Sequence, residues 1–310
     1  MTPPVLAGVD GSPESTAAAH WAAEEALRRG APLRLVHAWP WLTDGRASFA
    51  DPDDLPVAAQ RMLAGTADEV RERHPGVHVH TDVVLDAAVD GLVAAAEGAG
   101  LLVVGSRGLG GFAGLLVGSV SMAVAARAAA PVVVVRAAGP SGTGTAAAAA
   151  AHPGTGTGTG AGEGAGAGAV SEVVVGVDAG APSDAVLAFA FREAGLRGAR
   201  VRAVHGWDLP PAFAVVGFLP SGTEMAQLQA GEQKALAAAL AAHRERHPET
   251  EVVEQVRLGA ARTLVEESAG AGLVVVGRRR RPHDFGPRLG RVAHAVLHHA
   301  HAPVAVVPHD

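Results

Sequence analysis

The sequence predicts an α/β protein made of two Rossmann-like, doubly wound domains, each with a five-stranded parallel sheet of strand order 3-2-1-4-5 flanked by helices. Two observations lead to this prediction. Short Val/Leu runs bounded by turn residues alternate with alanine-rich stretches of helical length, which is typical of βα units whose parallel strands are buried on both faces. The pattern occurs twice in 310 residues, a length that suits two domains.

Internal repetition supports the second observation. The segments VLAGVDGSPES at 5–15 and VVVGVDAGAPS at 173–183 match at an offset of 168 residues, as do LRLVHAWPW and VRAVHGWDL. Further along, AGLLVVGSRG matches AGLVVVGRRR and APVVVVR matches APVAVVP, both at an offset of 172. Four matches in the same order indicate a duplicated domain.

The elements of the first copy follow in order from this pattern. The apolar runs predict strands at residues 5–10, 33–39, 77–85, 100–105 and 131–136. The alanine-rich stretches predict helices near residues 13–29, 56–73, 87–97 and 119–129. Ser12 followed by Pro13 suits the N-cap and first turn of the first helix. The second copy is expected to repeat these elements.

A composition change separates the two copies. Residues 138–169 are rich in Gly, Ala and Thr, have no hydrophobic period and carry almost no charge, which predicts a flexible linker. The first domain is therefore expected at 1–137 and the second at 170–310.

Composition excludes several classes of function. The chain has no cysteine, which rules out disulfides, thiolate zinc sites and cysteine nucleophiles, and makes the cytoplasm the expected location. A net charge of −6 gives no general attraction to nucleic acid or to an anionic membrane. Residues 108–126 are uncharged but hold five glycines, and no secretory signal is indicated at the start, so no membrane segment is expected.

The predicted strand order places a binding crevice. A sheet of order 3-2-1-4-5 reverses direction between strands 1 and 4, and ligands bind above that split. Asp10 follows the first strand and Gly105 the fourth, so both should line this crevice. The single lysine, Lys234, follows no glycine loop, which excludes a Walker-type phosphate loop, and GVDGSP after the first strand is not the Rossmann glycine fingerprint.

Backbone chemistry remains for holding an anion. Gly105 and Gly108 let the main chain approach a phosphate closely, and Gly118 lies where a helix begins, so free N–H groups and the positive end of the helix dipole point into the crevice. The hydroxyls of Ser119 and Ser121 add donors. The alternative is that the glycines serve a tight turn and helix packing alone.

These residues resemble a known family. The spacing Gly105-x2-Gly108-x9-Gly118-Ser119 is similar to the ATP-binding loop of the universal stress proteins, and VDGSPES, VHAW and APVVVVR also occupy that family's positions. The resemblance implies that ATP, with Mg²⁺ as a candidate companion ion, is the ligand. It implies that Asp10 and Ala38 contact adenine or ribose. It further implies that the phosphates lie against Gly105, Gly108, Gly118, Ser119, Val120 and Ser121.

The second copy departs from this loop. It keeps Asp178, Gly277 and Gly290, but has Arg280 in place of the second glycine and Arg291 in place of the serine. The side chain at 280 is expected to intrude on phosphate approach and weaken or alter binding. The candidate second site comprises Asp178, Gly277, Gly290 and Arg291. A separate anion held by arginines, or a solvated basic loop, are the alternatives.

The resemblance also implies how the copies pair. Residues 132–135 and 304–307 are edge strands, and the family pairs such edges across a two-fold axis. We therefore expect an intramolecular pseudo-dimer with the two edge strands antiparallel, while further homo-oligomers and the identity of any protein partner stay open. The expected function is an adenine-nucleotide-binding regulatory protein of the stress response, with at most slow ATP hydrolysis. A nucleotide-hydrolysing or adenylyl-transfer enzyme and a scaffold that binds no nucleotide are the alternatives.

Histidines and one acidic loop are weaker candidates. His294 and His298 have a zinc-like spacing without an acidic partner, and imidazoles there also suit the end of a helix. His37 and His205 end the second strand of each copy and are interpreted as histidines satisfied by hydrogen bonds. The acidic loop is read as solvated, with metal binding as its alternative, and comprises Asp51, Asp53 and Asp54.

Overall fold

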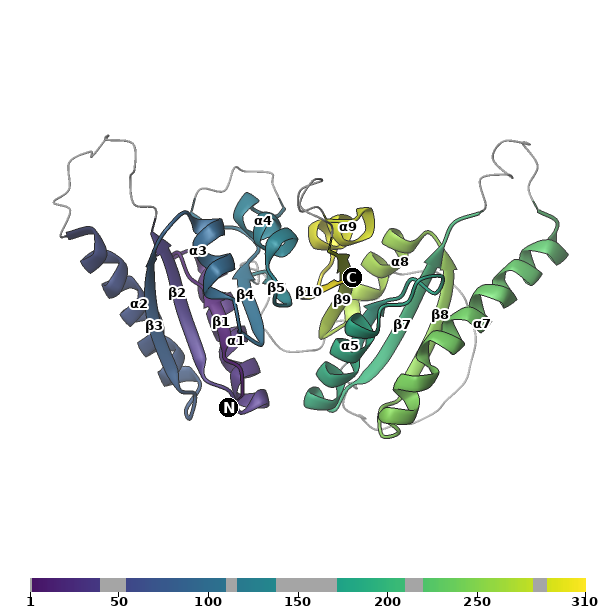
Figure 1. The fold of residues 1–310 in the computed structure, drawn as a ribbon, viewed down its shortest axis with the longest axis horizontal. Coiled ribbons are helices and arrows are strands. Elements are labelled where there is room, and N and C mark those ends of the chain that lie inside the picture. The colour runs from purple at the N-terminus through teal and green to yellow at the C-terminus, as the bar shows by residue number, and fades with distance from the viewer. Residues whose placement is uncertain (1, 40–53, 110–115, 138–171, 210–219, 281–288) are drawn as a thin grey trace, which may run out of the picture.

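The structure is a computed structural model that describes residues 2–39, 54–109, 116–137, 172–209, 220–280 and 289–310 (Figure 1). The first half contains β1 (Val5–Gly8), α1 (Pro13–Arg29), β2 (Leu33–Trp39), α2 (Asp54–Arg73), β3 (Val79–Leu85), α3 (Ala88–Ala95), β4 (Leu101–Gly105), α4 (Ser119–Arg127) and β5 (Val132–Val135). The predicted linker, residues 138–169, lies outside the described residues.

The second half repeats this succession. It contains β6 (Glu172–Gly176), α5 (Asp184–Arg197), β7 (Arg200–Trp207), α7 (Gly222–Arg246), β8 (Val252–Leu258), α8 (Ala260–Glu267), the 3-10 helix η1 (Ser268–Gly270), β9 (Leu273–Arg279), α9 (Arg291–His299) and β10 (Val304–His309). Each predicted element of the first copy is present, with ends that differ by two residues at most.

The strand order confirms the predicted topology in both halves. One sheet runs β3-β2-β1-β4-β5-β10-β9-β6-β7-β8, so that each half has the order 3-2-1-4-5. All pairs within a half are parallel, and β5 pairs with β10 antiparallel. The register at this junction places Val304 opposite Val134 and Val306 opposite Val132. This antiparallel pairing confirms the expected intramolecular pseudo-dimer. The pairing is favourable because it satisfies the backbone groups that each edge strand would otherwise expose.

Helices cover both faces of the continuous sheet (Figure 1). One core lies between the sheet and helices α1, α2, α5 and α7, and the second lies between the sheet and α3, α4, α8 and α9. Helix α1 begins where the sequence predicts, since Ser12 accepts a hydrogen bond from the Ser15 amide at 3.2 Å and Pro13 occupies the first turn. Gly30 ends it in the left-handed conformation, with φ 58°.

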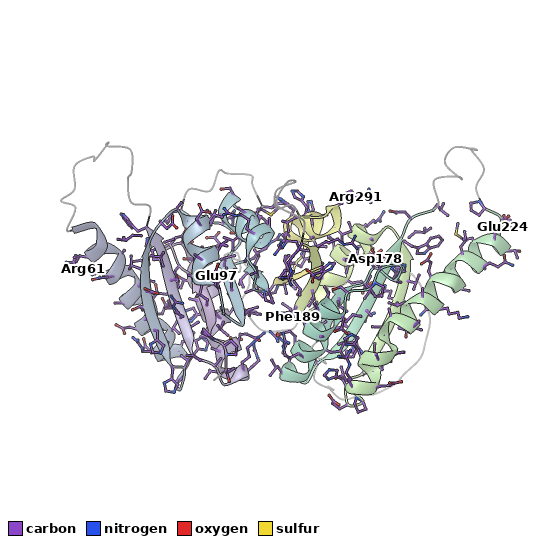
Figure 2. All side chains as sticks on the ribbon, in the orientation of Figure 1. Arg61, Glu97, Asp178, Phe189, Glu224 and Arg291 are labelled. Atoms are coloured by element: carbon purple, nitrogen blue, oxygen red, sulfur yellow. The ribbon has the colours of Figure 1, made fainter. Side chains whose placement is uncertain are left out.

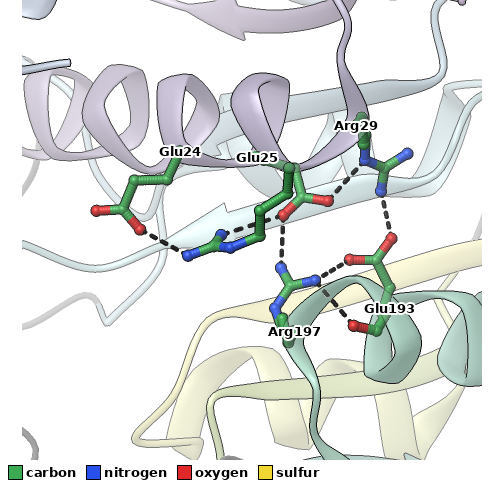
Figure 3. A network of polar contacts seen from close by, with 6 residues as sticks. Glu24, Glu25, Arg29, Glu193 and Arg197 are labelled. Atoms are coloured by element: carbon green, nitrogen blue, oxygen red, sulfur yellow. Dashed lines mark hydrogen bonds and ion pairs between the residues drawn. The ribbon is translucent and has the colours of Figure 1, made fainter. Parts of the chain in front are cut away.

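A buried ion-pair network joins the halves between α1 and α5 (Figure 3). The side chains of Glu25 and Glu193 are fully buried, and each contacts both Arg29 and Arg197. The Arg29 Nε–Glu25 Oε1 and Arg197–Glu25 Oε2 distances are 2.6 and 2.7 Å. Burial opposes ionisation of Glu25, but the charges of Arg197 and Arg29 outweigh it and lower the pKa of this carboxyl.

Two further arginines cross between the halves to helix C-termini. Arg136, just after β5, donates to the carbonyls of Leu297, His298 and Ala300 at 2.5–2.7 Å, at the end of α9. Arg278 on β9 donates to the carbonyl of Ala128 at the end of α4. Guanidinium groups suit these ends because the last helical carbonyls lack partners and carry the negative end of the dipole.

Candidate functional site

The first crevice lies at the switch point of the first half. β1 pairs with β2 on one side and with β4 on the other, so the turn after β1 and the loop after β4 leave the sheet side by side. Asp10 occupies the first of these turns and Gly105 ends the strand before the second. The sequence prediction brought these two residues together for the same reason.

Asp10 joins the two loops. Its Oδ1 accepts hydrogen bonds from the amide and hydroxyl of Ser12 at 3.0 and 2.5 Å, and its Oδ2 accepts one from the amide of Leu109 at 3.2 Å. Burial works against the charged form, but these hydrogen bonds together outweigh it and lower the pKa of Asp10. The carboxylate is thus ionised at neutral pH and acts as an acceptor.

Two of the predicted phosphate-loop glycines are explained by packing. A Cβ on Gly105 would lie 2.7 Å from the carbonyl carbon of Glu14, so this glycine lets β4 approach the first turn of α1. A Cβ on Gly108 would lie 2.4 Å from Oδ2 of Asp10. The backbone contact requires glycine at position 105 whether or not a ligand binds, and glycine at position 108 leaves room for the Asp10 carboxylate in its observed place.

Gly118 presents the start of α4 without a side chain. It is the N-cap of α4, with φ −74° and ψ 155°, and its amide donates to the carbonyl of Ser106 at 2.7 Å. The first amides of a helix have no partner within it, so those that follow Gly118 are available to an anion. Ser119 and Val120 are exposed at this end. Residues 110–115 of the loop lie outside the described part of the chain.

The remaining predicted residues have mainly structural contacts. Ser121 is buried, and its hydroxyl donates to the carbonyl of Gly105 at 2.6 Å, which ties α4 to β4 and turns this proton away from a ligand. Ala38 is buried on β2, where a Cβ added to Gly91 of α3 would lie 3.1 Å from its methyl group. Sequence reasoning missed Ser106, a buried residue that holds the loop end through its carbonyl.

The corresponding crevice of the second half contains a cavity of about 710 Å³. All four residues of the candidate second site line it: Asp178, Gly277, Gly290 and Arg291. Asp178 and Arg291 are labelled in Figure 2. A Cβ on Gly290 would meet nothing within 4 Å, so there is open space beside the start of α9. The cavity also borders Arg279 and the buried His205.

Arginines change the chemistry of this second crevice. Arg291 is 91% exposed and lies 3.6 Å from Asp208, a weak ion pair that leaves its guanidinium accessible. Arg280, expected to obstruct phosphate approach, is not among the described residues that line the cavity; its Nε lies 3.4 Å from Asp310. The amide of Arg280 donates to the carbonyl of His309 at 2.5 Å, so its backbone is also held beside the last residues of β10.

The strand-end histidines bond as interpreted. Nδ1 of His37 lies 2.6 Å from the carbonyl of Val9, and Nδ1 of His205 lies 2.9 Å from that of Val177. Nε2 of His205 also lies 2.9 Å from Oε2 of Glu232. These contacts fix the orientation of each ring at the crevice edge.

The two histidines with a zinc-like spacing lie close together on α9. The rings of His294 and His298 have centroids 4.6 Å apart. Within the described ranges, no group of three or more histidine and carboxylate side chains is arranged to hold a metal ion. Asp51 and Asp53 lie outside those ranges, and the side chain of Asp54 is not described. No helix in the described part of the chain is long and apolar enough to cross a membrane.

The fold and the two crevices define a class: a tandem, doubly wound α/β protein with a switch-point crevice in each half. Residues 1–136 and 170–308 match the model of the universal stress protein family, and the chain belongs to that family. A universal stress protein of Mycobacterium tuberculosis (strain ATCC 25618 / H37Rv) is 34% identical over 324 residues, covering 97% of this chain and 96% of the relative.

Two further comparisons agree. A universal stress protein of Mycolicibacterium smegmatis is 32% identical over 317 residues, covering 98% of this chain and 96% of the relative. The solved structure of a universal stress protein from Archaeoglobus fulgidus DSM 4304 has a TM-score of 0.65 at 17% identity, covering 99% of this chain and 96% of that chain. At that identity the structure supports the fold alone.

Proposed function

We propose that the first half binds ATP in the crevice between β1 and β4, and that nucleotide occupancy sets a regulatory conformation in a cytoplasmic stress protein. The observation that carries this proposal is the Asp10 carboxylate, which accepts hydrogen bonds from the turn after β1 and from the loop after β4, the loop that leads to the start of α4. The domain boundaries 1–137 and 170–310, with 138–169 as linker, belong to the same proposal.

The residues present fit an adenine nucleotide. Asp10 keeps acceptor capacity for a ribose hydroxyl, because a carboxylate accepts more bonds than the three described here. The amides after Gly118 and the exposed Ser119 hydroxyl offer donors to phosphate oxygens, with the helix dipole in place of a lysine. ATP would bring its own Mg²⁺, for which we assign no side chain.

Gly118→Val tests the phosphate position. A branched side chain at the N-cap would cover the first amides of α4, and we expect at least a tenfold loss of ATP affinity by isothermal titration calorimetry. Gly290→Val makes the equivalent change in the second half and serves as the matched control. Unchanged affinity of the first half in Gly118→Val would contradict the assignment.

Asp10→Asn tests the base and ribose end. Losing one charge-assisted hydrogen bond weakens binding by about 1.5–3 kcal/mol, roughly 10- to 150-fold. Because Asp10 also joins the loops, the melting temperature of Asp10→Asn without nucleotide separates loss of a ligand contact from a general effect on the fold. Unchanged ATP affinity in Asp10→Asn, with loss of a measurable hydrolysis rate, would favour the enzyme alternative.

We further propose that the second crevice takes an anionic ligand through Arg291 and Arg279. A cavity of about 710 Å³ is in the range of small-molecule sites, and Asp178 and His205 also line it. Mass spectrometry of whatever ligand the purified protein releases on denaturation identifies it. Arg291→Ser, which restores the residue of the first half, should lower affinity for a non-nucleotide anion and leave ATP binding in the first crevice unchanged.

A further inference from the structure

A pair of histidines lies away from both crevices, between α1 and the end of α2 in the first half. His20 belongs to α1, and His74 directly follows α2. Nδ1 of His20 lies 3.2 Å from Nε2 of His74, and the ring centroids are 5.3 Å apart at 46°. Two imidazole nitrogens, one from α1 and one from the residue after α2, therefore lie side by side.

Glu69 sets the tautomer of this pair. Its Oε1 lies 3.0 Å from Nε2 of His20, and since a carboxylate only accepts, Nε2 carries the proton. In the neutral ring this leaves Nδ1 of His20 as an acceptor, so Nε2–H of His74 donates the hydrogen bond between the rings when no metal is bound. A metal ion replaces this proton, and the neutral His74 ring then carries its proton on Nδ1. Carboxylates hold metal-binding histidines in the same way, through the ring nitrogen that is not bound to the metal.

The separation fits a metal ion shared by both rings. Zinc lies about 2.0–2.1 Å from histidine nitrogen, so two such nitrogens at the tetrahedral angle lie roughly 3.3–3.4 Å apart. The observed separation is 3.2 Å. We propose that His20 and His74 form a binding site for Zn²⁺ or a similar divalent transition metal, with Glu69 as a positioning residue.

Water completes the coordination in this proposal. Glu24 is one helical turn after His20 and shares its face of α1, but its carboxylate is paired with Arg28 at 3.0 Å. The protein ligands are therefore the two imidazoles. His20 is largely buried, with 11% of its side chain exposed, which restricts the rotamers available to it. A bound cation would link α1 to the end of α2.

The second half provides an internal control. The segment RERHP occurs at 71–75 and again at 244–248, so His247 corresponds to His74. Ala188 and Ala242 stand where the first half has His20 and Glu69. Ala188 and His247 line one surface hollow of about 480 Å³, and His247 stacks on Phe191 instead, with centroids 5.4 Å apart. The histidine after the long helix therefore contacts a second histidine in the first half and a phenylalanine in the second.

Titration of full-length protein with Zn²⁺, followed by calorimetry, tests the proposal. Because His294 and His298 are also adjacent, every protein in the series carries His294→Ala and His298→Ala. We expect the background protein to bind one equivalent that is lost in His20→Ala and equally in His74→Ala, with no further loss in the double variant. Glu69→Gln should weaken it about tenfold, and Glu69→Ala more.

A gain-of-site variant extends the test. Ala188→His adds an imidazole to the hollow beside His247, and in the His20→Ala protein it should restore Zn²⁺ binding. Circular dichroism and the melting temperature without metal show that each variant is folded. If His20→Ala and His74→Ala both still bind one equivalent of Zn²⁺ with unchanged affinity, the proposed site is overturned. Weak adventitious Zn²⁺ binding that is the same in every variant would also overturn it.

Discussion

The two halves share one topology and differ at the crevice. In the first half the Asp10 carboxylate closes onto the amide of Leu109, and Gly105 and Gly108 allow backbone and carboxylate to pack closely. In the second half the corresponding Asp178 is exposed and accepts from Gly180 at 3.2 Å, and arginines border an open cavity. The strand order fixes where a ligand lies, whereas the loop residues decide which chemistry holds it.

The ion-pair network uses equivalent residues of the two halves, and disrupting it has the largest expected effect. Glu25→Ala and Glu193→Ala each leave Arg29 and Arg197 short of a buried carboxylate, so each should lower the free energy of unfolding by about 3–5 kcal/mol. Chemical denaturation measures this. Glu266→Ala, which removes an exposed partner of Arg262, should change stability by less than about 1 kcal/mol.

Equal losses in Glu25→Ala and Glu193→Ala would confirm that the pseudo-two-fold relation is energetic as well as geometric. A loss confined to one of them would show that the halves use the network unequally. A loss no larger than that of Glu266→Ala in either variant contradicts the buried network itself.

The equivalent glycines Gly105 of β4 and Gly277 of β9 should respond differently to alanine. In Gly105→Ala the new Cβ meets the backbone of Glu14 and Ser15 at 2.7–2.9 Å, which cannot move cheaply, so we expect destabilisation by about 1–3 kcal/mol. In Gly277→Ala the nearest atom, at 2.9 Å, is Nε2 of the flexible His309, so the loss should be smaller. Thermal unfolding of both variants orders them, and a larger loss in Gly277→Ala would contradict the packing argument.

The smallest expected effect concerns pH and the first strand of each half. Glu172 of β6, where the first half has Pro4, is bonded to Arg202 and Arg200. Burial raises the pKa of this carboxyl, but these arginines outweigh burial and lower it overall. The resulting stabilisation is present above the unfolded-state pKa and is lost as pH falls through the lower folded-state pKa.

Glu172→Gln should therefore flatten the acid limb of the stability curve below about pH 4.5, the ordinary range of a glutamate pKa, and reduce stability at neutral pH. Urea denaturation at stepped pH measures both. Parallel curves for the parent and Glu172→Gln across the acid range would contradict this assignment.

The sequence predicted the secondary structure well because its signals are local. Val/Leu runs and alanine-rich stretches decide strand and helix, and the turn chemistry of Ser12 and Pro13 decides where α1 begins. Helix and strand ends were less well placed: the third strand was expected from residue 77 but begins at Val79. Val77 is buried and its amide bonds to His74 in the preceding turn.

The sequence also predicted which two loops meet at the crevice of the first half. Asp10 and Gly105 meet because any parallel sheet of this order brings the ends of strands 1 and 4 together. The roles of individual residues were harder to assign. Ser121 was expected to donate to phosphate, yet its hydroxyl bonds to Gly105, because the distance between α4 and β4 is set by packing.

The sequence by itself determined the duplicated α/β architecture, the crevice positions and the family, because repeats, periodicity and motif spacing can be read along the chain without knowing how it packs. The tertiary structure alone decided which charges meet. Glu25 and Arg29 recur as Glu193 and Arg197 at the same offset of 168, so the repeat can be seen in the sequence. That these residues contact one another across the halves follows only from the packing of α1 against α5. His20 and His74 are 54 residues apart and converge only where α1 packs beside the end of α2. Such contacts depend on distances between elements, which only packing of the whole chain sets.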